Sequence, residues 1–106
     1  MTAKEYVKQI KKIDTQLKNK AFEKKQMEGL GLSADDIIAE INALKDERAN
    51  IIHTIEQLPE AKYDVLHRVY VQGQTLYEVA ADRGMCYSNA TTIHGNALSD
   101  LDSIIN

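Results

Sequence analysis

Apolar residues recur every three or four positions through the first 58 residues, and this spacing places them on one face of an α-helix. The first series predicts a helix over residues 3–27 that begins at the N-cap Thr2 and is stopped by the stretch from Gly29 to Leu32. Its members are Ala3, Tyr6, Ile10, Ile13, Leu17, Lys20, Lys24 and Met27. Because Lys20 and Lys24 are charged, we expect the apolar seam to weaken toward the end of this helix, where Phe22 is a candidate replacement.

A second series predicts a helix that begins at the N-cap Ser33 and ends at Pro59, because a proline disfavours helical geometry in the residue before it. Its members are Ile37, Ile41, Leu44, Arg48, Ile51, Ile55 and Leu58. Arg48 alone interrupts the apolar spacing. It either forms a buried ion pair that sets the register of the helices or extends its charged end to solvent, and we favour the second interpretation.

Two helices of similar length that are joined by a short glycine turn favour an antiparallel hairpin. Charge supports this pairing, because residues 1–28 carry eight Lys and four Asp/Glu, a net of +4, whereas residues 33–58 carry two Lys/Arg and six Asp/Glu, a net of −4. The oligomeric state is open. A hairpin that uses both seams internally is a monomer, whereas a second stripe of Phe22, Ile38 and Ile52 would form a homodimer through the N-terminal helices.

Residues 59–106 show a more compact pattern with turns at Gly73 and Gly84. Three short helices are expected at about residues 60–71, 76–83 and 88–104. A helix, a short turn with a glycine and another helix form the helix-turn-helix pattern. The expected fold class is therefore all-α, with an antiparallel helical hairpin (a coiled coil) over residues 1–58 and a three-helix domain containing a helix-turn-helix over residues 59–106.

Composition narrows the class of protein. The chain has 106 residues, one proline, five glycines and no tryptophan, which favours long uninterrupted helices. Its formal net charge of −3 gives no general basic excess of the kind that indicates nucleic-acid binding. A single cysteine, a lysine-rich start in place of a signal peptide and the lack of a long apolar run lead us to expect a cytoplasmic protein with no membrane contact.

The stretch from Gln74 to Leu101 combines a threonine, an acidic residue, a Val-Ala pair, a glycine turn and a helix that ends in Ala-Leu-x-x-Leu. Without a gap, this order resembles region 4 of bacterial sigma factors. The whole chain is similar to a narrower group, the small phage-encoded regulators of the ArpU type, and shares with it an Ile-His-Gly at residues 93–95. The resemblance implies a transcription regulator of phage genes in a bacterial host, with promoter DNA and host RNA polymerase as partners.

The resemblance also assigns candidate DNA-contacting residues. In a helix-turn-helix, outward residues at the start of the last helix reach base edges in the major groove. By position, the candidate residues here are Thr75, Tyr87, Ser88, Asn89, Thr91, Thr92 and His94. An asparagine can bridge N6 and N7 of adenine, hydroxyl groups can bond bases or phosphates, and Thr75 opens a helix whose first N–H groups can meet a phosphate. For His94, packing or capping is the alternative, and we slightly favour it.

Few cations accompany these residues, and no Lys or Arg follows Arg83. Affinity for phosphates comes mainly from Lys and Arg. Arg68 and Arg83 are the candidate phosphate contacts, although Arg83 stands at a position that is usually apolar in the family, where its stem can be partly packed. We therefore expect a partner such as RNA polymerase to hold the domain on DNA by raising its local concentration.

A second hypothesis is a protein–protein interaction module, in which the hairpin binds a partner and a degenerate sigma-like domain acts as an adaptor or decoy. An enzyme is a distant third, because no phosphate-binding glycine loop, carboxylate pair or nucleophile arrangement stands out. No cofactor or metal is expected, since the histidines and Cys86 lack zinc-ligand spacing. Cys86 is interpreted as a small buried or capping residue, and the four tyrosines after Pro59 as packing residues. The lysines Lys18, Lys20, Lys24 and Lys25 are interpreted as a solvated face, and a patch that contacts a DNA backbone or an acidic partner is the alternative.

Overall fold

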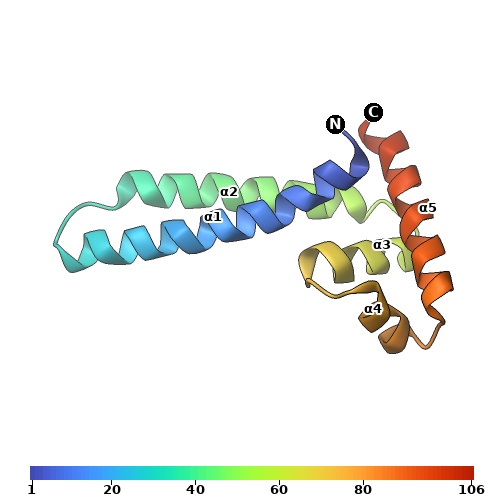
Figure 1. Ribbon diagram of the computed structural model, residues 1–106. Coiled ribbons are helices and arrows are strands. Elements are labelled where there is room, and N and C mark those ends of the chain that lie inside the picture. Colours follow the sequence, from blue (N-terminus) through green and yellow to red (C-terminus); the bar gives the residue numbers. More distant parts are fainter.

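The computed structural model describes residues 1–106 and is entirely helical, which confirms the expected all-α class (Figure 1). Its elements are α1 (Ala3–Gly29), α2 (Asp35–Ile55), α3 (Glu60–Leu66), the π-helical η1 (His67–Val71), α4 (Leu76–Arg83) and α5 (Tyr87–Ile105). The helices α1 and α2 lie side by side and run in opposite directions, and the other elements gather where α1 begins and α2 ends. The molecule measures 54 × 30 × 19 Å, and none of its helices has the length and apolar character that crossing a membrane requires.

The start of α1 is capped as expected, because the Thr2 side chain accepts a hydrogen bond from the Glu5 N–H at 3.1 Å. The start of α2 differs from the prediction. Its N-cap is Ala34, and the predicted cap Ser33 only accepts a long 3.4 Å bond from the Asp35 N–H. Ala34 itself is buried, so the chain enters α2 through an apolar contact in place of a side-chain cap.

The end of α2 also differs from the prediction. The helix ends at Ile55, four residues before Pro59, and a turn follows in which the Leu58 N–H bonds the Ile55 carbonyl at 3.1 Å. This turn directs Leu58 into the core, where it is 7% exposed. Packing of Leu58 therefore decides where the helix stops, and Pro59 instead takes the N-cap position of α3.

The helix after Pro59 changes its hydrogen-bond pattern halfway. The segment α3 continues directly into η1, and the Gln72 N–H bonds the His67 carbonyl five residues earlier, at 3.0 Å. Such π-helical turns are rare and occur mostly as single turns inside α-helices. The apolar spacing of residues 60–71 predicted one regular helix, because a slip of one hydrogen bond leaves the pattern of apolar residues almost unchanged.

The core is shared between the two parts of the chain. Its largest cluster joins seven buried residues: Ala3, Val7, Ile55, Leu58, Leu66, Ala97 and Leu101. Residues from both sides of Pro59 thus bury one another, and the start of α1 packs against α5. A second cluster of Ile10, Ile13 and Ile51 lies further along α1 and α2. All members of the two predicted seams are buried or half-buried.

Charged residues complete the contact between α1 and α2. The Arg48 Nε donates to Asp14 Oδ1 at 2.7 Å, so Arg48 forms an ion pair across the two helices in place of the favoured extension to solvent. Lys20 likewise reaches Glu40 of α2 at 2.6 Å, and this hydrogen bond raises the pKa of the lysine. Phe22 does not take the place of Lys20 and Lys24 in the apolar seam, because its side chain is 63% exposed.

Candidate nucleic-acid interface

The helices α4 and α5 are joined by a tight turn at Gly84. This glycine caps the C-terminus of α4 in the left-handed conformation, with φ 66° and ψ 37°, which a residue with a Cβ adopts only at a cost. The Met85 N–H then bonds the Ala80 carbonyl at 2.9 Å, and Cys86 occupies the N-cap position of α5. The sequence prediction of a second helix from Leu76 to Arg83 agrees with the structure.

The first turns of α5 present a polar outer surface. Tyr87, Ser88, Asn89, Thr91 and Thr92 are all exposed, whereas Ala90 between them is completely buried. The hydroxyl groups of Thr91 and Thr92 donate to the carbonyls of Tyr87 and Ser88, at 3.0 and 2.9 Å. Their oxygens can still accept hydrogen bonds, but their hydrogens are used. The amide of Asn89 makes no hydrogen bond within the chain and can therefore both donate and accept outside it.

Thr75 has a structural role that the sequence prediction did not assign to it. Its side chain accepts from the Glu78 N–H, and its own N–H donates to Glu78 Oε1, which together form a capping box. A carboxylate therefore already occupies the start of α4. The predicted contact between this helix start and a phosphate is not favoured, because Glu78 takes up the exposed N–H group and repels a second anion.

Two tyrosines form an exposed pair beside this surface. The rings of Tyr77 and Tyr87 stack with their centroids 4.1 Å apart and an interplanar angle of 12°. Tyr77 is 69% exposed and Tyr87 is 43% exposed, so these two tyrosines pack against each other at the surface and not in the core. Tyr63 and Tyr70, by contrast, pack against the main core as predicted. The pair joins the start of α4 to the start of α5, ten residues apart, and no helical spacing in the sequence indicates such a contact.

His94 lies further along α5 and is held by the neighbouring π-helical segment. Its Nε2 is 2.8 Å from the Tyr70 hydroxyl, and the two rings stack at 5.7 Å. Burial lowers the pKa of His94, and the nearby charge of Lys4 lowers it further. Burial also raises the pKa of Tyr70. His94 is therefore a packing residue that is neutral at pH 7, in agreement with the alternative that the sequence favoured.

The two arginines predicted to contact phosphates are bound within the chain. Asp64 accepts from the Arg68 Nε at 2.8 Å and from the Arg83 Nη1 at 2.5 Å. Arg68 also bonds Asp82, at 3.2 Å. Burial by itself raises the pKa of Asp64, but the hydrogen bonds from both arginines outweigh burial and lower the pKa overall. The assignment of Arg68 and Arg83 to phosphates stays a prediction, and these ion pairs do not favour it, because both side chains are already held by Asp64.

Of the two interpretations of Cys86, a buried or a capping residue, the structure contradicts burial, because the cysteine is exposed at the N-cap position of α5. Its sulfur lies 3.3 Å from the Ser88 hydroxyl. That hydrogen bond, with help from the Asn89 backbone N–H, lowers the pKa of the Cys86 thiol. Cys86 therefore takes the place of a hydroxyl cap without making the usual capping bond.

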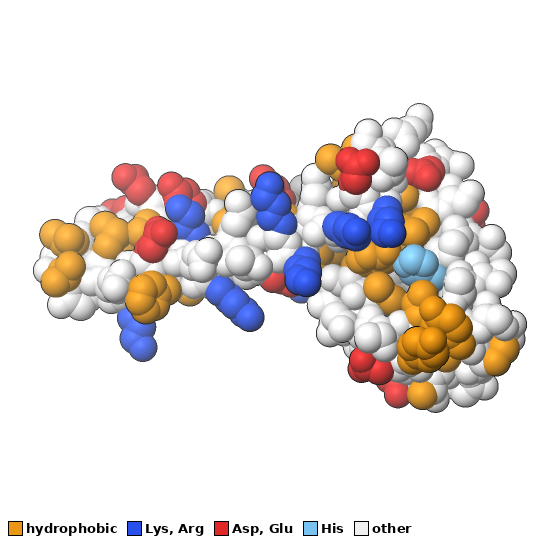
Figure 2. Space-filling model, viewed as in Figure 1, with side chains coloured by type: hydrophobic (Ala, Val, Ile, Leu, Met, Phe, Trp, Pro, Cys, Tyr) orange, Lys and Arg blue, Asp and Glu red, His pale blue; other side chains and the backbone are white.

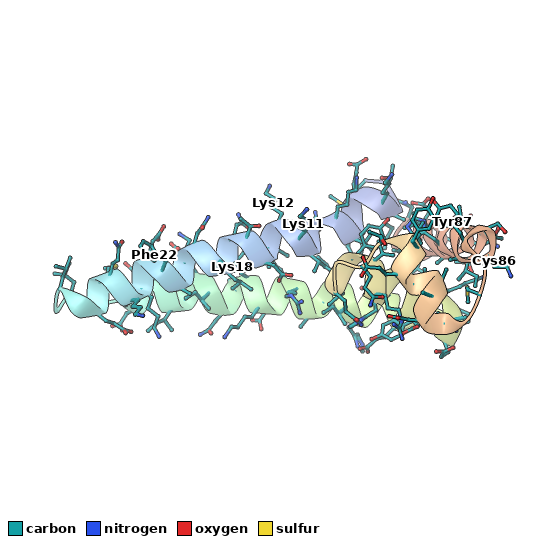
Figure 3. The ribbon with its side chains drawn as sticks, turned by 60° about the horizontal axis from the view of Figure 1, so that its bottom comes forward. Lys11, Lys12, Lys18, Phe22, Cys86 and Tyr87 are labelled. Atoms are coloured by element: carbon teal, nitrogen blue, oxygen red, sulfur yellow. The ribbon has the colours of Figure 1, made fainter.

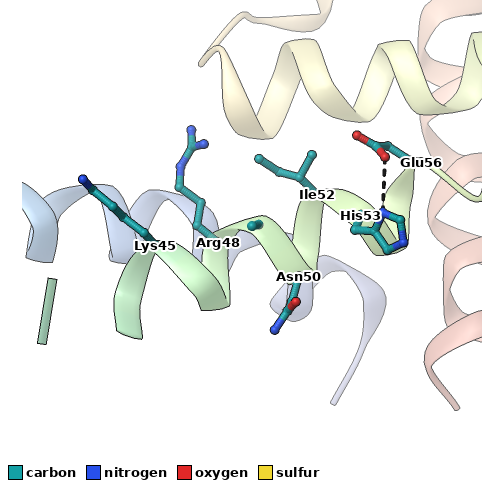
Figure 4. Close-up of a pocket in the computed structure, with 7 residues that line it drawn as sticks. Lys45, Arg48, Asn50, Ile52, His53 and Glu56 are labelled. Carbon is teal, nitrogen blue, oxygen red and sulfur yellow. Dashed lines mark ion pairs between the residues drawn. The ribbon is translucent and has the colours of Figure 1, made fainter. Parts of the chain in front are cut away.

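A hollow along α2 is a further concave feature lined by charged residues (Figure 4). All of its lining residues come from the stretch between Lys45 and Glu56. The one ion pair among them joins His53 Nδ1 to Glu56 Oε2 at 3.5 Å, and the His53 side chain is 82% exposed. Because these groups come from a single helix and its cap, they do not converge on a common point in the way that a catalytic site requires.

Comparisons with protein-family models, with curated proteins and with solved structures found no match to this chain.

Proposed function

We propose that this chain is a DNA-binding regulator of transcription. In this proposal α4, the turn at Gly84 and α5 act as a helix-turn-helix of the sigma-region-4 type, and α1 and α2 form a coiled-coil hairpin. The observation that carries the proposal is the polar surface at the start of α5, which is exposed immediately after a left-handed glycine turn while Ala90 anchors the same helical turn in the core. Exposed residues at this position of a helix-turn-helix reach base edges in the major groove.

Asn89 is the residue expected to contribute most to sequence preference. Its amide is exposed and unbonded, whereas the hydroxyl hydrogens of Thr91 and Thr92 are already used within α5. A bidentate asparagine–adenine contact discriminates against other bases by about 1–3 kcal/mol. The exposed rings of Tyr77 and Tyr87 lie at the edge of the same surface, where an aromatic side chain can contact a thymine methyl group or a sugar.

RNA polymerase is the proposed second partner. The domain after Pro59 carries only three Lys/Arg, and all of them form ion pairs within the chain. Independent binding to DNA through this domain alone would therefore be weak. A protein that holds the domain beside a promoter raises its local concentration and compensates for the missing contacts.

The experiment is a selection of bound duplexes from a random-sequence pool, with the full chain alone and with purified bacterial RNA polymerase. An enriched sequence is expected in at least one of the two arms. On that sequence, Asn89→Ala should weaken binding about 5- to 150-fold, the equivalent of 1–3 kcal/mol, whereas the matched control Asn42→Ala, an exposed asparagine of α2, should leave it unchanged. The proposal fails if neither arm enriches a sequence or if the two variants bind alike.

A protein–protein interaction module is the second candidate, and the far end of the hairpin favours it. Three large apolar side chains are exposed there, namely Phe22 at 63%, Leu30 at 75% and Leu32 at 55%. Figure 2 shows hydrophobic side chains at this end of the molecule, away from the other elements. If this surface binds RNA polymerase, Leu30→Ser with Leu32→Ser should abolish binding in a titration, and if it forms a homodimer, the same change should give a monomer in sedimentation equilibrium.

A further inference from the structure

Positive charge that is free of ion pairs is concentrated on α1. Six of the 13 Lys/Arg residues form ion pairs: Lys20, Lys24, Arg48, Lys62, Arg68 and Arg83. The other seven are Lys4, Lys8, Lys11, Lys12, Lys18, Lys25 and Lys45, and all except Lys45 belong to α1. The part of the molecule that resembles a DNA-binding domain thus has no free cation, and the helix packed against it has most of them.

Four of these lysines, Lys4, Lys8, Lys11 and Lys12, form a group that we call the α1 lysine row. All four side chains are exposed, and they fall within nine residues. Lys4, Lys8 and Lys11 follow one another at four and three residues, which is about 6 and about 4.5 Å along a helix, so they share one face. The buried residues Ala3, Val7 and Ile10 occupy another face of α1, which leaves the row free to meet a partner.

The α1 lysine row lies beside the elements that lead to the candidate interface. Lys8, Lys11 and Lys12 line a hollow together with residues 69–73 of η1 and the turn after it. Lys4 lies close enough to His94 of α5 for its charge to lower the pKa of that histidine. His94 in turn is seven residues, or about two helical turns, after Tyr87, and so lies on the same flank of α5.

The figures agree with this placement. Figure 2 shows Lys and Arg side chains beside a histidine and a hydrophobic patch on one face of the wider end of the molecule. In Figure 3, Lys11 and Lys12 lie along α1 toward the same edge as Tyr87 at the start of α5. The row and the first turn of α5 therefore border one continuous surface.

We propose that the α1 lysine row binds the phosphate backbone of the same DNA duplex whose bases are contacted by α5. This inference rests on the proposed function and extends it, because it makes the first third of α1 part of the DNA interface. Duplex DNA carries one negative charge for about every 1.7 Å of its axis, so a row of lysines along a straight helix can meet several phosphates at once. The row also supplies the cations that α4 and α5 lack, since Arg68 and Arg83 are held by Asp64.

The test measures fluorescence anisotropy of a labelled 30-base-pair duplex of mixed sequence over a range of salt concentrations. The test variant is Lys8→Gln with Lys11→Gln and Lys12→Gln. The control, Lys18→Gln with Lys25→Gln and Lys45→Gln, removes the same charge from exposed lysines that are equally free of ion pairs but lie away from α5. Lys4 stays unchanged in both, because its charge also acts on His94. Circular dichroism of both variants checks that they fold alike.

Each lost phosphate contact lowers the slope of log K against log salt by about 0.9. We therefore expect the test variant to lose about two to three units of slope and the control less than one. The inference is overturned if the test and control variants lose the same slope. It is also overturned if the test variant loses as much binding to polyglutamate as to the duplex, because an acidic protein would then be the partner of the row. Absence of any duplex binding by the unaltered chain at low salt overturns it as well. If Asn89→Ala loses sequence preference while its salt slope is unchanged, base contacts by α5 and phosphate contacts by the α1 lysine row act separately. A failure of the proposed function can then be distinguished from a failure of this inference.

Discussion

The contact between α1 and α2 follows one sequence repeat along its length, yet its two ends are buried to different degrees. Near the start of α1, Ile10 is fully buried and Ile51 is 5% exposed. Further out, Leu17, Ile41 and Leu44 occupy equivalent positions of the repeat but are only half-buried. The difference arises because η1, α3 and α5 cover the seam at the inner end, whereas the outer part consists of two helices alone.

This difference shows that two helices alone bury their apolar seam less completely than helices that are covered by further elements. A pair of helices leaves the sides of its seam open to water, so the outer part gains less from each apolar side chain than a core covered by further elements. Ion pairs accompany the seam there, between Asp14 and Arg48 and between Lys20 and Glu40. Exposed pairs of this kind contribute about 0–1 kcal/mol each. The outer part is therefore expected to be held mainly by its continuity with the inner end.

The largest effect is expected from shortening one isoleucine in each part. Ile10→Ala removes a fully buried side chain and should lower the free energy of unfolding by about 2–5 kcal/mol. The matched change Ile41→Ala removes the same atoms from a half-buried position and should cost less than half as much. Urea unfolding followed by circular dichroism measures both. Equal losses would contradict the contrast between the two parts.

An intermediate effect is expected from the ion pairs. Asp64→Asn removes the negative charge that Arg68 and Arg83 share, and we expect a loss of about 1.5–3 kcal/mol, the range for hydrogen bonds to charged groups. Lys20→Gln breaks the pair with Glu40 in the outer part and should cost much less, because exposed ion pairs contribute little to stability. Thermal unfolding at pH 7 compares the two, and a larger loss from Lys20→Gln would reverse our ranking of the ion pairs.

The smallest effect concerns pH. The pKa of His94 is lowered in the folded chain, so the unfolded chain takes up a proton at a higher pH than the folded one. Stability is then fully present above the ordinary histidine pKa of 6.5 and is lost as the pH falls from there toward the lowered pKa. His94→Gln should flatten this fall between pH 7 and 5, whereas His53→Gln, at an exposed position of α2, should keep it. Urea midpoints at four pH values measure the slope, and identical slopes for both variants would show that His94 is not its source.

The sequence predicted the positions of the helices well, because helix formation here follows local signals. Apolar spacing, Thr2 and Gly84 act within one or two turns, and the structure contains the corresponding helices, cap and left-handed turn. The predicted start and end of α2 were less accurate. At the start, the buried Ala34 takes the N-cap position without a side-chain cap, and at the end tertiary packing of Leu58 decides where the helix stops. Val7 was absent from the predicted seam for the same reason, since it joins the cluster that contains Ala97 and Leu101.

The candidate site was predictable only in part. Exposure of Ser88, Asn89 and Thr92 follows from their place on a helix whose opposite face is apolar, which a sequence shows directly. Ion pairing of Arg68 and Arg83 with Asp64 depends on how three helices approach one another. No local pattern carries that information, and the same holds for the nearness of the α1 lysine row to α5.

The contact between the start of α1 and the end of α5 affects how the protein folds during synthesis. The Ala3 N–H donates to Asp102 Oδ1 at 2.6 Å, and Ala3 and Val7 share a cluster with Ala97 and Leu101. Contacts between such distant residues require most of the chain to be ordered first, which slows folding relative to a protein held by local contacts. During synthesis the first helix thus emerges long before α5, and the part of its apolar side that packs on Ala97 and Leu101 stays uncovered until those residues have left the ribosome.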